Sequence, residues 1–183
     1  MKNLSGKEFP VIDSSLGDEM QKIIELARLD GDSVGGVVET AITGVNAGLG
    51  EHMFDGVEGR IASIVFGIPA VKGIEFGSGF YGSSLFGSKN NDPFVTDGAS
   101  VRTKTNNAGG ILGGMTTGMP VVFRCALKPT PSIATEQDSV SLSRMENVKI
   151  KINGRHDPCI AVRAVPVFEA ACAIAVLDMM LDT

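Results

Sequence analysis

Glycine is the residue type that most constrains how this chain can fold. Of its 23 glycines, 20 lie between Gly31 and Gly118. Glycine loses more backbone freedom on folding than any other residue, so a folded chain retains it mainly where the backbone needs an unusual conformation or a close approach. We therefore expect region 31–118 to contain many tight turns or close backbone contacts.

Length and composition indicate one globular domain. The chain has 183 residues, of which 43% are apolar, which is enough for a packed core and too many for a disordered chain. Its formal charge of −5 disfavours nucleic-acid binding, because that affinity comes mainly from neutralising phosphates. Three cysteines without C-x-x-C spacing suggest neither a disulfide framework nor a zinc site, and two histidines leave little for any other metal. We interpret Cys159 and Cys172 as small buried hydrophobic residues.

Two segments bear on localisation. The first seven residues lack the apolar run of a secretory signal. The most apolar stretch, 164–181, carries Glu169 and Asp178, so we expect a buried helix rather than a membrane span. Together these features predict a cytoplasmic protein without membrane contact.

Apolar periodicity predicts helices and alternating strands that are intermixed along the chain. We expect a first helix at 15–29, opened by a capping box of Ser15 and Asp18, and a last helix with Pro166 in its first turn. The remaining expected elements are a helix at 57–65, strands at 33–45, 71–76 and 148–152, and a hairpin within 109–127 that turns at 116–118. Because the strands alternate apolar and polar residues, the expected fold class is α+β with antiparallel sheets.

The polar, glycine-rich stretch from Gly77 to Lys104 is expected to be a long loop. Its start, Gly77-Ser-Gly79-Phe-Tyr-Gly82, matches the dinucleotide-binding fingerprint, with Asp97 at the expected distance. A true fingerprint must open a helix, whereas the residues that follow show no helical stripe. We therefore favour a mobile glycine loop, and a nucleotide-dependent dehydrogenase is a distant alternative.

A second glycine-rich stretch, 106–118, has Gly109, Gly110, Gly113 and Gly114 without side chains on one side. Such a surface lets a flat or charged ligand approach the backbone, but it also suits a tight contact between strands or subunits. The residues alone leave these two interpretations equal.

Two further segments carry groups suited to anions and proton transfer. Lys128-Pro-Thr-Pro-Ser132 presents an ammonium and two hydroxyls on a backbone stiffened by proline, which suits a phosphate. Gly154-Arg155-His156-Asp157 places a guanidinium and a carboxylate on one side of an extended segment, with His156 on the other. The simpler alternatives, a strand edge and a structural Arg–Asp pair, are favoured by the residues alone.

Four ordered blocks of the chain resemble the C-terminal half of chorismate synthase. They are PAVKGIEFG at 69–77, NNAGGILGGMTTG at 106–118, ALKPTPSI at 126–133 and GRHDPCIAVRAVPVFEA at 154–170. The resemblance implies half of that family's fold, in which antiparallel sheets pack with helices in a layered sandwich. It reverses the preference for the simpler alternatives above.

The resemblance implies a specific chemistry. Chorismate synthases are lyases of the shikimate pathway of aromatic amino acid biosynthesis; they remove phosphate and a proton from 5-enolpyruvylshikimate 3-phosphate in a 1,4-elimination. The reaction needs reduced FMN without net redox change. The implied catalytic residue is Asp157, which would accept or relay the proton at flavin N5, and Arg155 would also reach the substrate phosphate. The implied flavin contacts are Pro69, Ala70, Asn106, Gly113, Lys128, Pro129, Thr130, Pro131, Ser132 and Arg155, with Pro69 contributing only backbone and shape.

The resemblance does not extend to the family's N-terminal half, which holds two catalytic histidines and most substrate-binding arginines. We expect residues 1–183 to be a single domain, the C-terminal flavin-binding half, with little synthase activity and weak FMN binding when alone. Because the family forms homotetramers, we expect a homo-oligomer. The competing hypothesis is a non-catalytic oligomerising or flavin-binding module, which the joint presence of Lys128, Arg155 and Asp157 argues against.

Overall fold

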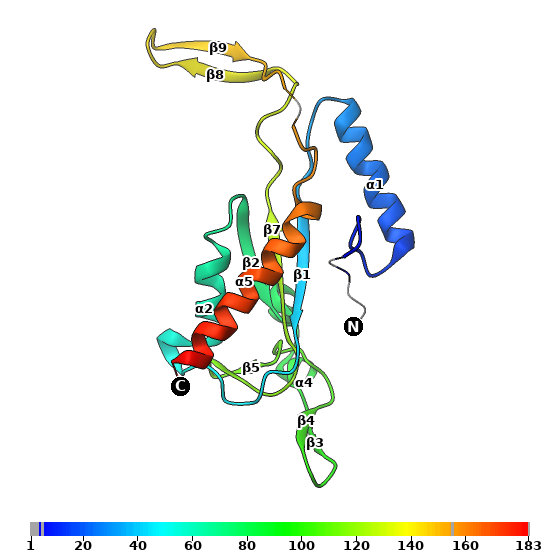
Figure 1. Cartoon of the computed structure of the whole chain (residues 1–183), viewed down its shortest axis with the longest axis vertical. Coiled ribbons are helices and arrows are strands. Elements are labelled where there is room, and N and C mark those ends of the chain that lie inside the picture. Colours follow the sequence, from blue (N-terminus) through cyan, green and yellow to red (C-terminus); the bar gives the residue numbers. More distant parts are fainter. Residues whose placement is uncertain (1–3, 5, 155, 183) are drawn as a thin grey trace. The chain divides into compact units, whose positions relative to one another are not determined.

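The computed structural model describes residues 4, 6–154 and 156–182. These residues form two compact units: a first unit of Met1–Gly36 with Leu127–Val165, and a second unit of Val37–Ala126 with Pro166–Thr183. Helices and antiparallel strand pairs occur in the same chain (Figure 1), which confirms the predicted α+β class.

The first unit contains helix α1, Ser14–Leu29. The helix lies where the periodicity predicts, and Gly31 follows it with a left-handed φ of 69°, as expected for a helix stop. The predicted capping box is wrong, because Asp13 caps the helix and accepts hydrogen bonds from the N–H and the hydroxyl of Ser15 at 2.9 and 2.7 Å. An aspartate before the first helical residue satisfies a free backbone donor just as a serine would.

The first unit also contains a hairpin of β8, Gln137–Ser141, and β9, Glu146–Ile150. Ser139 pairs with Val148, and Lys149 forms an ion pair with Asp138 at 2.5 Å. The predicted strand at 148–152 is present but begins two residues earlier. Most of its side chains are exposed, as its alternating lysines indicate.

A three-stranded sheet forms the centre of the second unit (Figure 1). Its strands, in spatial order, are β1, Gly36–Ile42; β7, Val121–Leu127; and β2, Val71–Phe76. The central strand β7 alternates strictly, and Phe123 and Cys125 are fully buried. Helix α2, Val57–Val65, contributes its apolar stripe to the same core through Val57 and Ile61.

Helix α5, Ala161–Leu181, is the longest element of the chain and packs on the sheet (Figure 1). Phe168 and Cys172 are buried, and burial raises the pKa of the Cys172 and Cys125 thiols to about 12, as expected for cysteines that act as hydrophobic residues. By length and composition α5 could also cross a membrane, a test that core helices pass as well. Its buried face favours the predicted core role.

Pro166 does not lie in the first turn of α5, as the sequence predicts, but at the sixth helical residue. The helix begins earlier because Ala164 already donates its N–H to the carbonyl of Ile160, at 3.1 Å. Proline has no N–H, so Pro166 cannot make the usual helical bond to the carbonyl of Val162.

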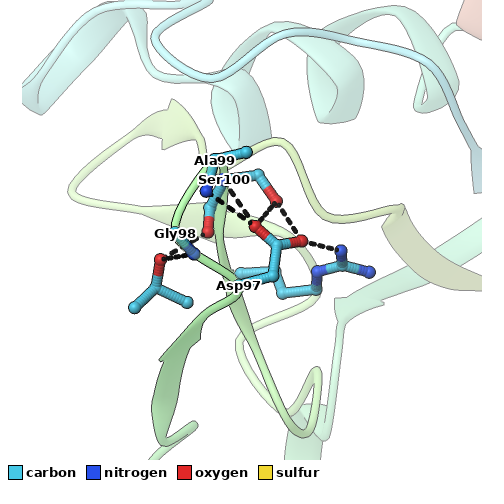
Figure 2. A network of polar contacts seen from close by, with 6 residues as sticks. Asp97, Gly98, Ala99 and Ser100 are labelled. Atoms are coloured by element: carbon cyan, nitrogen blue, oxygen red, sulfur yellow. Dashed lines mark hydrogen bonds and ion pairs between the residues drawn. The ribbon is translucent and has the colours of Figure 1, made fainter.

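The segment 77–104 is not the long loop that its weak periodicity predicts. It folds into the one-turn helices α3, Gly79–Gly82, and α4, Gly87–Asn90, followed by a hairpin of β3, Phe94–Thr96, and β4, Val101–Thr103. Asp97 holds the hairpin turn by accepting hydrogen bonds from the N–H groups of Ser100 and Ala99 and from Arg102 (Figure 2). These bonds hold the pKa of Asp97 well below its ordinary value. Hydrogen bonds from single side chains hold this segment in place. They need no regular spacing of apolar residues, so the sequence shows no periodic pattern here.

The glycine-rich stretch forms a hairpin, but not at the predicted turn. Strand β5, Ile111–Leu112, pairs with β6, Met115–Thr116, so the turn is Gly113–Gly114 rather than 116–118. Both turn glycines have positive φ, 60° and 87°, which few other residues adopt. A short 3-10 helix η1, Met53–Asp55, precedes α2.

Candidate functional site

The positions predicted to bind flavin or to act in catalysis divide between the two units. Lys128–Ser132 and Asp157 belong to the first unit, and the second unit holds Pro69, Ala70, Asn106 and Gly113. Arg155, predicted to contact both flavin and substrate phosphate, lies outside the described residues.

The Lys128–Ser132 segment follows the end of β7 and is held by the connector between α1 and β1. The hydroxyl of Ser33 donates to the carbonyl of Thr130 at 2.7 Å. Gly35 lies so close that a Cβ there would come within 3.2 Å of the Pro129 ring. The segment is thus fixed by tertiary contacts as well as by its two prolines, which limits the entropy it would lose on binding a ligand.

Thr130 carries a buried hydroxyl that has no hydrogen-bond partner among the described residues. Leaving a buried hydroxyl unpaired costs about 1–3 kcal/mol, so native structures usually give it a partner. Lys128, two residues earlier, is exposed and takes part in none of the ion pairs that the described residues form. This segment therefore offers donors that an acceptor-rich ligand would satisfy.

Asp157 is held in one orientation and is partly open to solvent. Its Oδ1 accepts the N–H of Cys159 at 3.1 Å, and its Oδ2 accepts a longer hydrogen bond from Nη1 of Arg163 at 3.4 Å. About a quarter of the side chain is exposed (27%). One carboxylate oxygen is thus anchored, while the other makes only a long contact.

A cavity of about 860 Å³ in the first unit brings Ser132 and Asp157 together. His156 lines the same cavity and is exposed, as the sequence predicts. That its side chain faces the opposite side from Asp157 stays a prediction. Ser33 and Arg163 also line the cavity and were not singled out from the sequence. They come from a connector and from the start of a helix, so only the fold shows that they meet Asp157. The complete lining is Arg28, Gly31, Asp32, Ser33, Ser132, Ile133, Ala134, Gly154, His156, Asp157, Pro158 and Arg163.

In the second unit, Pro69 and Ala70 form the turn between α2 and β2. Ala70 has a φ of 72°, which is uncommon for a residue with a side chain. Backbone strain of this kind persists only where the surroundings enforce it, and it is often found at ligand sites. That Pro69 acts on a flavin through backbone and shape stays a prediction.

The sequence left open whether the glycines of 106–118 allow a ligand to approach or a tight backbone contact, and the structure gives different answers for different glycines. A Cβ at Gly109 would lie 2.5 Å from the backbone nitrogen of Gly77, and one at Gly110 would collide with the carbonyl of Pro120. Gly114 is equally tight against the carbonyl of Glu51. These three glycines serve close backbone packing. Gly113 is the only glycine of this stretch where an added Cβ would have no atom within 4 Å. It is therefore the only one of them with open space that a ligand could occupy.

Asn106 lies beside this stretch, and its amide nitrogen donates to the carbonyl of Pro120 at 2.8 Å. Its role in flavin binding remains a prediction that would use the side-chain oxygen. The neighbouring backbone is held by Asp92, which the sequence did not single out. Asp92 accepts hydrogen bonds from the N–H groups of Asn107 and Ala108, both at 2.8 Å, and from the Thr105 hydroxyl at 2.6 Å.

The segment Gly77–Gly82 differs from the glycine loop that the sequence predicts, because it contains the one-turn helix α3 and is held by a side chain. The carboxylate of Glu75 accepts the N–H of Phe80 at 2.9 Å and pairs with Arg124 at 2.8 Å, so a protein carboxylate already occupies the start of α3. A Cβ at Gly79 would collide with that carboxylate. Asp97, the acidic residue at fingerprint distance, holds the β3–β4 turn instead (Figure 2).

Known proteins show similarity over almost the whole chain. The family described as chorismate synthase matches residues 1–181. The chain is 48% identical over 180 residues to the chorismate synthase of Dehalococcoides mccartyi, covering 98% of this chain and 50% of that protein. It is 51% identical over 159 residues to the chorismate synthase of Korarchaeum cryptofilum, covering 87% and 44%. A crystal structure of chorismate synthase resembles it with a TM-score of 0.73 and 32% identity, covering 92% and 43%.

The chain spans about half the length of the curated relatives it matches. Sequence and structure nevertheless agree, because the solved relative shares the fold as well as a third of the residues. These matches confirm the resemblance carried by the four ordered sequence blocks and the predicted fold class. The chain belongs to the chorismate synthase family of enzymes.

Proposed function

We propose that this chain provides the flavin-binding half of a chorismate synthase. The whole enzyme would eliminate phosphate and a proton from 5-enolpyruvylshikimate 3-phosphate to give chorismate, a lyase reaction of aromatic amino acid biosynthesis. The chain would hold reduced FMN and work as part of a homotetramer in the cytoplasm. Family membership and the donor-rich Lys128–Ser132 segment support the proposal.

The observation that carries the proposal is the unpaired, buried hydroxyl of Thr130. FMN presents phosphate oxygens and ring carbonyls, all of which accept hydrogen bonds. Lys128 would contribute charge, and the hydroxyls of Thr130 and Ser132 would contribute directed donors from a backbone that is already rigid. The residues present therefore fit an anionic, acceptor-rich cofactor.

Asp157 would act as the proton acceptor of the elimination. When bound, the reduced flavin supplies electron density that stabilises charge developing as phosphate leaves. The bond from Cys159 N–H fixes Oδ1, so Oδ2 is the atom at which a proton would be taken up or relayed. Arg163, 3.4 Å from Oδ2, keeps this carboxylate beside a positive charge. Arg155 would bind the phosphate bidentately, as guanidinium groups do.

The flavin site can be tested by titrating the isotopically labelled chain with oxidised FMN and following backbone amide shifts by NMR. We expect saturable shifts at Lys128–Ser132 with weak affinity, because this chain spans about half the length of its relatives and the other half would supply further contacts. Thr130→Val should weaken binding about fivefold, the effect of one hydrogen bond. Thr96→Val, at the β3–β4 turn, is the matched control and should leave affinity unchanged. Absence of saturable shifts in this segment would contradict the proposal.

A further inference from the structure

The connector Gly31–Gly35, between α1 and β1, contacts both chain segments of the candidate site in the first unit. The carbonyl of Gly31 accepts the N–H of Ala134 at 2.8 Å, just beyond Lys128–Ser132, which we call the flavin-binding segment after its proposed role. The N–H of Val34 donates to the carbonyl of Pro158 at 2.8 Å, next to Asp157. The connector therefore fixes the spacing between these two segments.

Ser33 lies in the middle of this connector. Among the described residues, its hydroxyl makes one hydrogen bond, which goes to the flavin-binding segment. Its part-buried hydroxyl donates to the carbonyl of Thr130 at 2.7 Å, and its own N–H donates to the carboxylate of Asp32 at 2.7 Å. A bond to the Thr130 carbonyl sets the orientation of that peptide. Because the allowed side-chain rotamers depend on the backbone conformation, the same bond also limits the directions in which the unpaired Thr130 hydroxyl can point.

The rest of the connector leaves Ser33 little freedom to move. A Cβ at Gly35 would lie 2.5 Å from the carbonyl oxygen of Leu127, so this part of the backbone is in direct contact with the start of the flavin-binding segment. The Gly35 carbonyl also accepts a weak bond from the Cys159 thiol at 3.9 Å. Ser33 is thus held from both sides and can act as a fixed support.

We propose that Ser33 is a positioning residue for flavin binding: its hydroxyl holds the Thr130 peptide so that the Thr130 side chain is presented to the cofactor. This inference rests on the proposed function, because it assumes that Lys128–Ser132 contacts the flavin. Ser33 acts through Thr130 and not on the cofactor. Its removal should therefore loosen the segment in the free chain and weaken FMN binding, while the overall fold persists.

The test compares the wild-type chain with Ser33→Ala, Ser33→Thr and the control Ser84→Ala. Ser84 makes the same kind of bond, from its hydroxyl to the carbonyl of Tyr81 at 2.7 Å, but in α3 and the turn after it. FMN affinity is measured from amide shifts, and hydrogen exchange of the peptide covering 128–135 is measured without flavin. We expect Ser33→Ala to weaken FMN binding about fivefold and to speed exchange in this peptide, with recovery in Ser33→Thr and no change in Ser84→Ala.

The outcomes separate this inference from the proposed function. Wild-type chain that binds FMN, with Ser33→Ala binding equally well, would overturn the positioning role and leave the flavin site standing. An equal loss in Ser33→Ala and Ser33→Thr would show that packing rather than the hydroxyl matters, and would also overturn it. Wild-type chain without saturable shifts would overturn the flavin site and the positioning role together. Unchanged exchange at 128–135 in Ser33→Ala would contradict the positioning role whatever the flavin result.

Discussion

Single residues of the candidate site differ in whether their polar groups already have partners. Asp157 and Asn106 use part of their hydrogen-bonding capacity within the chain, whereas the buried hydroxyl of Thr130 uses none among the described residues. A group that costs stability in the free protein and gains a partner on binding is typical of a ligand site. Stability and binding should therefore respond to Thr130 in opposite directions.

The first prediction concerns Thr130→Val in the free chain. Valine has nearly the shape of threonine without the hydroxyl, so the substitution removes an unpaired buried group. We expect the free energy of unfolding, measured with urea, to rise by about 1 kcal/mol. A fall of similar size would mean that the hydroxyl has a partner in the folded chain and would remove the main support for the flavin site.

The second prediction concerns Asp92, which holds the backbone beside the glycine-rich stretch. Burial, the largest single influence, raises its pKa, but hydrogen bonds from Thr105, Ala108 and Asn107 together bring the pKa below the ordinary value. The ionised form therefore stabilises the fold above the unfolded-state pKa, and this contribution is lost as the pH falls through the lower folded-state pKa.

Asp92→Asn should accordingly lower the free energy of unfolding by about 1–3 kcal/mol at neutral pH, because the amide replaces a charged acceptor of three hydrogen bonds. The difference from wild type should shrink below the ordinary aspartate pKa of about 3.9. Urea unfolding across this pH range measures both effects, and Asp18→Asn on the exposed face of α1 is the control. A difference that does not depend on pH would contradict the account.

Among the elements, α2 and α5 are joined by an ion-pair network around Arg60. The guanidinium donates to Asp178 at 3.0 Å and to Asp182, and lies 4.0 Å from Asp55. The bond to Asp182, followed by the nearby carboxylates, raises the pKa of Arg60 above its ordinary value. This network fixes the C-terminal end of α5 against the helix before the Pro69–Ala70 turn.

The third prediction is that Arg60→Met lowers the melting temperature by a few degrees and that Arg60→Lys recovers only part of the loss. Methionine keeps much of the packing but none of the charge, and lysine cannot bridge several carboxylates with a planar fork. Thermal unfolding at low and high salt measures the effect, which should be smaller at high salt because exposed ion pairs are screened. No change in melting temperature would show that the network is incidental.

Much of the element pattern follows from the sequence, and its failures have physical reasons. The apolar period of α2 reflects burial, so it could be read directly. Helix α1 also lies where its period predicts, although its apolar side chains, such as Ile23 and Leu26, are more than half exposed. The short elements of 77–104 depend on Asp97 and similar side chains that bond the backbone, and the site-lining Ser33 depends on contacts across almost a hundred residues. Neither leaves a periodic signal. The roles of Arg155 and Asp157 are predicted only through the family resemblance, because the residues alone favour a structural pair.

At the scale of the whole molecule, α5 is apolar on both faces, although only one packs against the sheet. Ile174 and Leu177 are more than half exposed, at 59% and 58%. Beside them, within the second unit, lies a cleft of about 830 Å³ lined by residues of 40–49 and of α5. A helix that is hydrophobic all round is normally buried. Because the relatives are about twice as long as this chain, we expect the other half of the family's chain to cover this face.

We propose that this chain carries the flavin site and the proton acceptor of a chorismate synthase, and that catalysis also needs the other half of the family's chain. The most direct test measures turnover of 5-enolpyruvylshikimate 3-phosphate with chemically reduced FMN, without oxygen. It compares the chain alone with the chain mixed with the amino-terminal half of the Dehalococcoides mccartyi relative. The fourth prediction is little or no chorismate from the chain alone and clear turnover from the mixture, reduced about a hundredfold or more by Asp157→Asn. Turnover by the chain alone close to that of a full-length relative, or full activity of the Asp157→Asn mixture, would contradict the claim.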